Sequence, residues 1–115
     1  MNDFLLLFRN DNASQSNMSP EEMQQHMQKW RTWIGDLGKA GHFKSGEPLE
    51  RTGKVLRGKS KIVTDGPYAE SKDLVGGYLM ITAKNLDHAV ELARGCPIFE
   101  TDGIVEVRPV GKLEM

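Results

Sequence analysis

Two acidic side chains, Asp65 and Glu70, are the first candidates for chemistry because they flank a turn sequence. Asp65 begins Asp-Gly-Pro, and Glu70 follows in a charged loop. Two carboxylates at one pocket raise the pKa of one of them, which suits that group to proton transfer near neutral pH. The alternatives are a turn aspartate that accepts a backbone N–H and a solvated loop glutamate. Turn chemistry explains Asp65 but leaves Glu70 unexplained.

Charged residues of the last apolar segment suggest a site for an anion. Glu106 and Arg108 are two positions apart, so in a strand their side chains point to the same face. One interpretation is an ion pair of modest net effect. The other is that Arg108 presents its planar guanidinium to a carboxylate substrate while Glu106 fixes its orientation. Arg9, at the end of the first predicted strand, can reinforce either arrangement.

A histidine and two tryptophans lie on the longest predicted helix. His26 and Trp33 are one heptad apart on a shoulder of its apolar face, so both can line a cleft between this helix and a sheet. His26 is then a candidate base, and Trp30 and Trp33 are candidates for the wall of the site. The alternative is a partly buried helix histidine beside core tryptophans.

The elements that must position these residues follow from periodicity and turn signals. The apolar run Phe4–Phe8 predicts a buried strand. Ser19-Pro20-Glu21-Glu22 is a capping box with proline at the first helical position, so a helix begins there and ends near Gly38–Gly41. Four-three spacing predicts that its inward face consists of Met23, Met27, Trp30, Ile34 and Leu37.

The remaining segments predict strands and one shorter helix. An irregular strand is expected over 42–51, a hairpin over 54–57 and 61–64, a mostly apolar strand over 74–81, and a final strand over 104–110. Gly76 and Gly77 indicate a bulge or a close backbone approach. Asn85 caps a helix that ends before Gly95 and Pro97 and whose inward face is Leu86, Ala89, Val90 and Ala93.

This order of elements predicts one α+β domain over residues 1–115 with a ferredoxin-like fold (βαββαβ with an added β-hairpin): an antiparallel sheet with two helices on one face. The first and third core strands lie in the middle of such a sheet, and both are apolar on two faces. Helices cover only one of these faces. We therefore expect a second subunit on the other face, which makes a dimeric α+β barrel-like assembly.

Composition excludes several classes of function. The 115 residues carry 15 basic and 16 acidic side chains and a formal charge of −1, which gives no footprint for nucleic acid or a membrane surface. One cysteine and three histidines show no zinc-ligand spacing, and the glycine pair at 76–77 is no phosphate loop, so no metal or cofactor is expected. No export signal or membrane-spanning segment is recognised, and the cytoplasm is the expected compartment.

Three motifs carry a resemblance to a known family. Val63–Ile81 with its Asp-Gly-Pro-Tyr turn, Gly95-Cys96-Pro97, and the strand motif Val105–Pro109 together resemble the YciI-related family, in the branch named for Asp-Gly-Pro-Phe. Tyr68 stands where that motif has phenylalanine and is counted with the candidate binding residues. The resemblance extends from Phe4 to about Val110. It implies a small dimeric protein of ferredoxin-like fold.

The same resemblance bears on the helix histidine. Relatives carry a histidine on this helix paired with an aspartate, a proposed catalytic dyad, and they include an enzyme that removes chloride from a muconate-type acid. In this chain either His26 or Trp30 occupies that position.

Two functions fit these observations. The first is a homodimer that binds a small organic acid in a pocket between the long helix and the inner sheet face. Arg9 and Arg108 would hold the anion, and Asp65 or Glu70 would move a proton in an elimination, isomerisation or hydrolysis.

The second is a non-catalytic interaction module. Members of the resembling branch are labelled transcription initiation proteins or linked to alternative sigma factors. The predicted hairpin offers an acidic partner four basic side chains, Lys54, Arg57, Lys59 and Lys61. The ordinary alternative is a solvated edge, because lysines also discourage sheet edges from aggregating.

Overall fold

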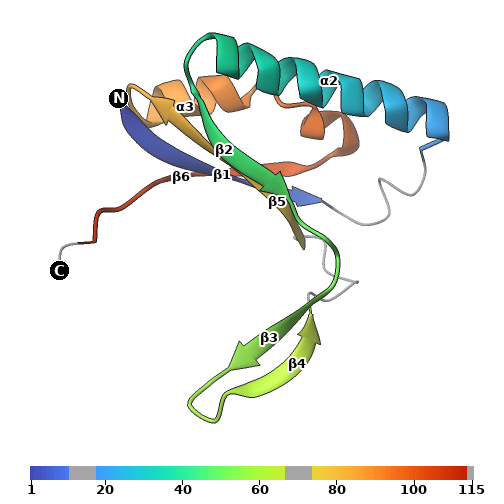
Figure 1. Ribbon diagram of the computed structural model, residues 1–115, viewed down its shortest axis with the longest axis vertical. Coiled ribbons are helices and arrows are strands. Elements are labelled where there is room, and N and C mark those ends of the chain that lie inside the picture. Colours follow the sequence, from blue (N-terminus) through green and yellow to red (C-terminus); the bar gives the residue numbers. More distant parts are fainter. Residues whose placement is uncertain (11–17, 67–73, 114–115) are drawn as a thin grey trace.

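Four antiparallel strands form a sheet that two helices cover from one side (Figure 1). The computed structural model describes residues 1–10, 18–66 and 74–113. Its elements are β1 (Asn2–Asn10), α2 (Pro20–Lys39), β2 (Phe43–Pro48), β3 (Gly53–Arg57), β4 (Ile62–Gly66), β5 (Leu74–Ala83), α3 (Leu86–Ala93), the 3-10 helix η1 (Pro97–Thr101) and β6 (Ile104–Pro109). The sheet order is β2-β5-β1-β6, so the predicted ferredoxin-like fold is confirmed.

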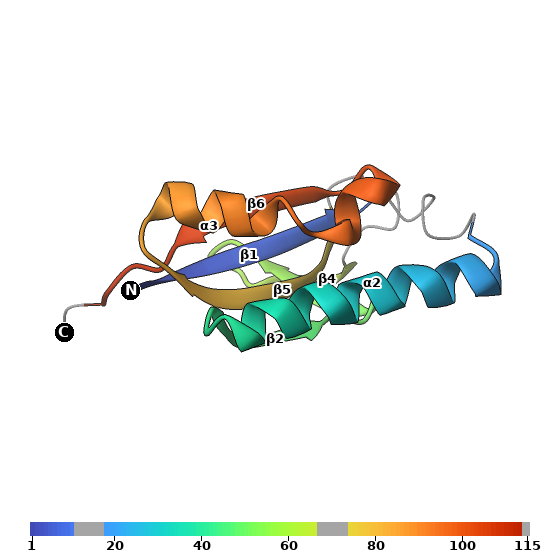
Figure 2. The same cartoon turned by 90° about the horizontal axis from the view of Figure 1, so that it is seen from above.

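The two apolar strands β1 and β5 lie in the middle of the sheet, as predicted. Along β1, Phe4, Leu6 and Phe8 are buried against the helices, whereas Leu5 and Leu7 point to the other face and are half-buried. We call this second side of the sheet, away from the helices, the open face. Figure 2 shows both helices on one side of the strands.

The glycine pair in β5 marks a bulge, as one of the two expected alternatives. Phe8 pairs with Gly77 and Arg9 with Val75, which leaves Gly76 as the extra residue. A side chain at Gly77 would meet the carbonyl oxygen of Glu47 on the neighbouring strand at 3.1 Å. The glycines therefore allow a bulge and a close approach of β2 at the same point.

Helix α2 begins as its capping sequence predicts, because the Ser19 hydroxyl accepts the Glu22 backbone N–H at 3.1 Å. The predicted inward face is confirmed for Leu37, which is buried, and for Trp30 and Ile34, which pack against the core, but it is wrong for Met27. Met27 is 43% exposed, and the buried residues are His26, Trp33 and Leu37.

Trp33 explains why His26 is buried beside the predicted face. Its indole N–H donates to the Leu92 carbonyl at 3.2 Å, so the ring packs between α2 and α3. Turning Trp33 inward carries His26, one heptad earlier, into the core as well.

Helix α3 is capped by Asn85, whose side chain accepts the His88 backbone N–H at 2.8 Å. Ala89 and Ala93 are buried as predicted, but Leu86 is 45% exposed because it lies in the first turn, beyond the edge of the core. The 3-10 helix that follows was not predicted. It ends at Asp102, which adopts the left-handed conformation (φ 56°).

Strands β3 and β4 form the predicted hairpin as a separate two-stranded sheet. In Figure 1 this hairpin projects on the side of the main sheet opposite the helices. Its turn includes Gly58 at φ 71° and Lys61 at φ 54°. The irregular strand expected over 42–51 is β2, with a register shift between Phe43 and Ser45. No helix among the described residues is long and apolar enough to cross a membrane.

Candidate functional site

Two arginines and one glutamate meet on the open face. The Arg9 guanidinium donates to one carboxylate oxygen of Glu106, and Arg108 Nη1 donates to the other at 3.1 Å. We call these three residues the arginine cluster. Its side chains are 31%, 30% and 66% exposed for Arg9, Glu106 and Arg108, so Arg108 faces solvent most. Two positive groups on one carboxylate leave an excess positive charge.

Strand register explains why these residues meet. Leu7 of β1 pairs with Glu106 of β6, and Arg9 pairs with Ile104, so the three strand positions share one face. The neighbouring positions on this face are half-buried and apolar or aromatic, namely Leu5, Leu7, Tyr78 and Met80. Such surroundings strengthen the attraction between the arginines and an anion, because they hold fewer water molecules than bulk solvent.

His26 is buried, at 5% exposure, and its two ring nitrogens face different partners. Nε2 accepts the Trp30 indole N–H at 3.0 Å, which places the proton of the neutral ring on Nδ1. Nδ1 lies 3.5 Å from Glu100 Oε2. His26 would have to release Trp30 before Nε2 could accept a proton from a substrate. This geometry holds α2 against η1. A catalytic role for His26 stays a prediction.

Glu100 joins the histidine to a surface lysine. Lys29 Nζ donates to Glu100 Oε1 at 2.8 Å, and this hydrogen bond is the main cause of a lowered pKa for the Glu100 carboxyl, with His26 adding to it. Glu100 is therefore a carboxylate over the whole neutral range.

Aromatic rings pack between α2 and the sheet. Phe8 of β1 makes edge contacts with Trp30 and Trp33 at ring-centroid distances of 5.1 Å and 6.1 Å, and the two indoles lie 5.8 Å apart. These contacts form one part of the interface between α2 and the sheet, and the ligand pocket predicted there stays a prediction. The contacts of both tryptophans here are those of core residues.

Asp65 lies on the hairpin, apart from the arginine cluster. Its carboxylate forms an ion pair with Lys54, the residue opposite it across β3 and β4, and its side chain is 90% exposed. The other predicted residues of this segment, Tyr68 and Glu70, lie outside the described residues. Within one chain the structure thus brings Arg9, Glu106 and Arg108 together and places Asp65 elsewhere.

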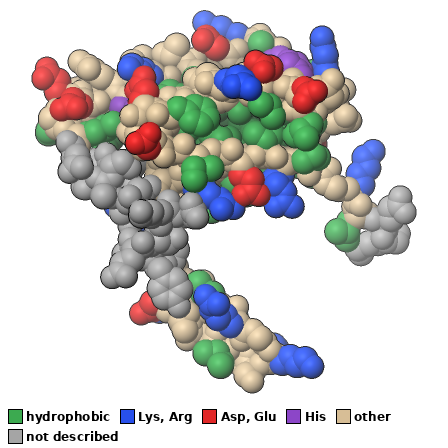
Figure 3. Space-filling model, turned by 180° about the vertical axis from the view of Figure 1, so that it is seen from behind, with side chains coloured by type: hydrophobic (Ala, Val, Ile, Leu, Met, Phe, Trp, Pro, Cys, Tyr) green, Lys and Arg blue, Asp and Glu red, His purple; other side chains and the backbone are tan. Residues whose placement is uncertain are grey.

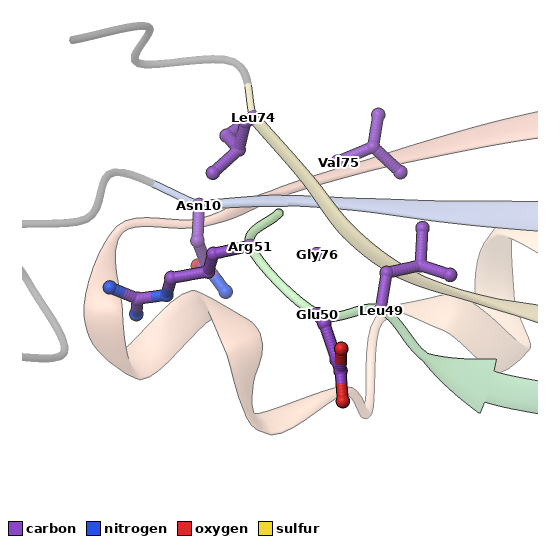
Figure 4. A pocket seen from close by; sticks show the side chains of 7 residues that line it. All are labelled: Asn10, Leu49, Glu50, Arg51, Leu74, Val75 and Gly76. Atoms are coloured by element: carbon purple, nitrogen blue, oxygen red, sulfur yellow. The ribbon is translucent and has the colours of Figure 1, made fainter. Parts of the chain in front are cut away.

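A small pocket of about 90 Å³, partly open to solvent, lies at the end of the sheet where the chain leaves for the hairpin. Figure 4 shows apolar side chains from Leu49, Leu74 and Val75 beside polar ones from three further residues, Asn10, Glu50 and Arg51. Asn10 directly follows Arg9, and its side-chain oxygen is buried without a hydrogen-bond partner among the described residues.

The YCII-related domain family matches residues 3–114 of this sequence. The chain belongs to the YCII-related family. Among solved structures it is similar to the 5-chloro-2-hydroxyhydroquinone dehydrochlorinase from Burkholderia phenoliruptrix AC1100, in complex with 2,5-dihydroxybenzoquinone, with 19% sequence identity, 90% of each chain covered and a TM-score of 0.46. No curated protein matches it in sequence.

Sequence analysis of this YCII-related protein missed two groups of residues. Asn10, Glu50 and Arg51 carried no motif, because they meet only through the end of the sheet and the path to the hairpin. Glu100 contacts His26 from 74 positions away, on a 3-10 helix that was not predicted. The described residues of this family member contain no group of three or more His, Cys, Asp and Glu side chains placed for a metal ion.

The single cysteine of this YCII-related protein, Cys96, is buried, and burial raises the pKa of its thiol to about 12. The unfolded thiol ionises near its ordinary value of 9.0. Between these two pH values only the unfolded state loses the proton, so this group lowers the free energy of unfolding as pH rises above 9.

We therefore expect iodoacetamide to leave Cys96 unmodified in the folded protein at pH 8 and to modify it fully in denaturant, as followed by mass spectrometry. Rapid labelling of the native protein would contradict the burial of this thiol.

Proposed function

We propose that this YCII-related protein, of the Asp-Gly-Pro-Phe branch, is a homodimer that binds a small organic acid and catalyses an acid–base reaction on it. The observation that carries the proposal is the arginine cluster on an apolar sheet face that no described residue covers. A guanidinium has five N–H donors, and Glu106 takes one from Arg108. Donors of Arg108 thus remain for the carboxylate of a ligand.

The homodimer is supported by the open face itself. Leu5, Leu7, Tyr78 and Met80 are half-buried there in a single chain, and a sheet is stable when both apolar faces are covered. The single chain is also more extended than a compact domain. Its Cα radius of gyration is 15.9 Å. A compact chain of this length has about 13 Å. A second copy placed face to face would cover the open face and give two copies of the arginine cluster close to the same interface.

The proposed chemistry assigns one role to each charge. Arg108 and Arg9 hold the carboxylate of the substrate and stabilise negative charge that develops when a neighbouring C–H loses its proton. Asp65 or Glu70 accepts that proton. In an elimination or isomerisation the carboxylate takes this proton from carbon, whereas in a hydrolysis it takes one from the attacking water instead. The substrate decides among them.

Thermal unfolding with a panel of small carboxylates, lactones and phenolic acids tests the binding step. A ligand at 100 times its dissociation constant adds about 2.7 kcal/mol to the free energy of unfolding. We expect such a rise for the native protein and at least a roughly tenfold weaker affinity for Arg108→Gln, which loses a charge-assisted hydrogen bond.

Arg94→Gln is the matched control. Arg94 is 69% exposed and paired with Glu91 on α3, so the same substitution there removes the same charge away from the open face. If no compound raises the unfolding temperature, or if Arg108→Gln and Arg94→Gln respond alike, the proposed acid site is wrong.

A further inference from the structure

The β3–β4 hairpin has features that a single chain leaves unexplained. A two-stranded hairpin in water is marginally stable at best without a layer to pack on. Here its apolar residues remain open to solvent, with Leu56 63%, Ile62 61% and Val63 56% exposed. Figure 3 shows hydrophobic and basic side chains on the hairpin, which stands clear of the rest of the molecule. Among residues 1–10, 18–66 and 74–113, the hairpin therefore has no surface to pack on.

The position of the hairpin indicates where that partner lies. Helices and hairpin are on opposite sides of the main sheet, so the hairpin projects on the side of the open face (Figure 1). Viewed from above, it lies beneath the strands of the same sheet (Figure 2). Whatever covers the open face must therefore also lie beside the hairpin.

Dimensions favour a second copy as this partner. Each hairpin strand has five residues. At about 3.3 Å per residue such a strand is roughly 17 Å long, whereas packed sheets lie about 10 Å apart. A hairpin that projects from one sheet can thus reach past the sheet of a face-to-face copy and lie against its body. Two-fold symmetry would give both hairpins the same contact.

Charge is complementary as well. Lys54, Arg57, Lys59 and Lys61 against Asp65 give residues 53–66 a formal charge of +3. Because the whole chain carries −1, the rest of it carries −4. The hairpin of one copy and the body of another thus carry net charges of opposite sign, which favours their approach at low ionic strength.

We propose that the hairpin is an arm that reaches past the open face and packs against the body of a second copy of this chain. Each arginine cluster is then enclosed between two sheets and bordered by two arms. This inference rests on the proposed homodimer and deepens it, because the acid site is incomplete in one chain. It also gives Asp65, which has no contact with the cluster of its own chain in the described structure, a route to the cluster of the partner.

Light scattering and sedimentation across a range of protein concentrations test the arm. Leu56 and Val63 face each other across the hairpin, so the double substitution Leu56→Glu, Val63→Glu places two charges on one exposed side without touching the core. We expect it to raise the dimer dissociation constant about 100-fold, as loss of a central apolar contact does. Leu86→Glu, at an exposed residue of α3 on the helix side, is expected to leave the constant unchanged.

A third variant separates the arm from the dimer itself. Leu7→Glu charges the middle of the open face, and we expect it to give monomers. A monomeric native protein would overturn both the homodimer and the arm. A dimer that Leu7→Glu breaks and the hairpin variant leaves intact would overturn the arm alone.

Hydrogen exchange gives a readout that needs no variant. Amides of residues 53–66 are expected to exchange rapidly in dilute, monomeric protein and at least about tenfold more slowly once the dimer forms, because packing protects the hairpin. Exchange that stays fast in the dimer would leave the hairpin free for another protein and would contradict the arm.

Discussion

Leu6→Ala is expected to lower the free energy of unfolding by about 3 kcal/mol, because it removes a fully buried side chain from a central strand and leaves a cavity. Leu6 is 0% exposed and sits in β1 between β5 and β6, where the helices pack on it from above. For a domain of this size the loss corresponds to a fall in melting temperature of roughly 10–15 °C. Calorimetry and urea unfolding at a fixed protein concentration measure both quantities.

Two further leucines supply the controls. Leu113→Ala removes the same atoms at an 85% exposed position, and a change of no more than about 0.5 kcal/mol is expected. Leu7 lies next to Leu6 but on the open face. Because association buries it, Leu7→Ala should lower the free energy of unfolding by a larger amount as protein concentration rises. A Leu6→Ala variant as stable as Leu113→Ala would show that the helices do not pack on this strand as described.

Gly103→Ala is expected to destabilise the protein by about 2 kcal/mol, because the site has no room for a methyl group. A Cβ there would overlap the fully buried Ile98, with its Cδ1 at 2.8 Å, and would lie 2.7 Å from Asn10 Oδ1. The Asn10 side chain also lines the pocket at the end of the sheet. The substitution should therefore disturb that pocket together with the core. Chemical denaturation measures the loss of stability.

Gly35→Ala makes the same substitution at a site where the opposite change in stability is expected. Gly35 lies within α2, and no atom would be within 4 Å of an added Cβ. Alanine is favoured over glycine in a helix interior by about 1 kcal/mol, so this variant should be more stable than the native protein. If Gly103→Ala and Gly35→Ala shift stability in the same direction, the close packing of Gly103 on Ile98 is incorrect.

Local signals predicted most elements well, because each rests on a short stretch of chain. The capping sequence at Ser19 fixed the start of α2, and Asn85 fixed the start of α3. The glycines of β5 predicted the bulge. Periodicity predicted most of the inward face of α2 but placed Met27 there, because hydrophobicity alone ranks Met27 above His26. The bulk of Trp33 and its hydrogen bond to Leu92 bring His26 inward instead.

The candidate site was predictable only where one strand carries it. Glu106 and Arg108 share a face through the alternation of a strand, so the sequence places them together. Arg9 joins them through the pairing of β1 with β6. The ferredoxin-like order predicts that these strands are neighbours, but it does not give the register that places Arg9 beside Glu106. Glu100 and Asn10 have no local signal, because long-range packing alone brings them to His26 and to the pocket.

The sequence by itself determined the order of strands and helices, the family, and the apolar character of both faces of β1 and β5, since these depend on residue types at short spacing. The tertiary structure decided the rest. It buried Trp33 and His26 of α2, packed aromatic rings of α2 on Phe8 of the sheet, and left the arginine cluster on the open face. It also set the hairpin apart from the main sheet, since a strand's pairing partner depends on contacts that no short segment of the chain contains.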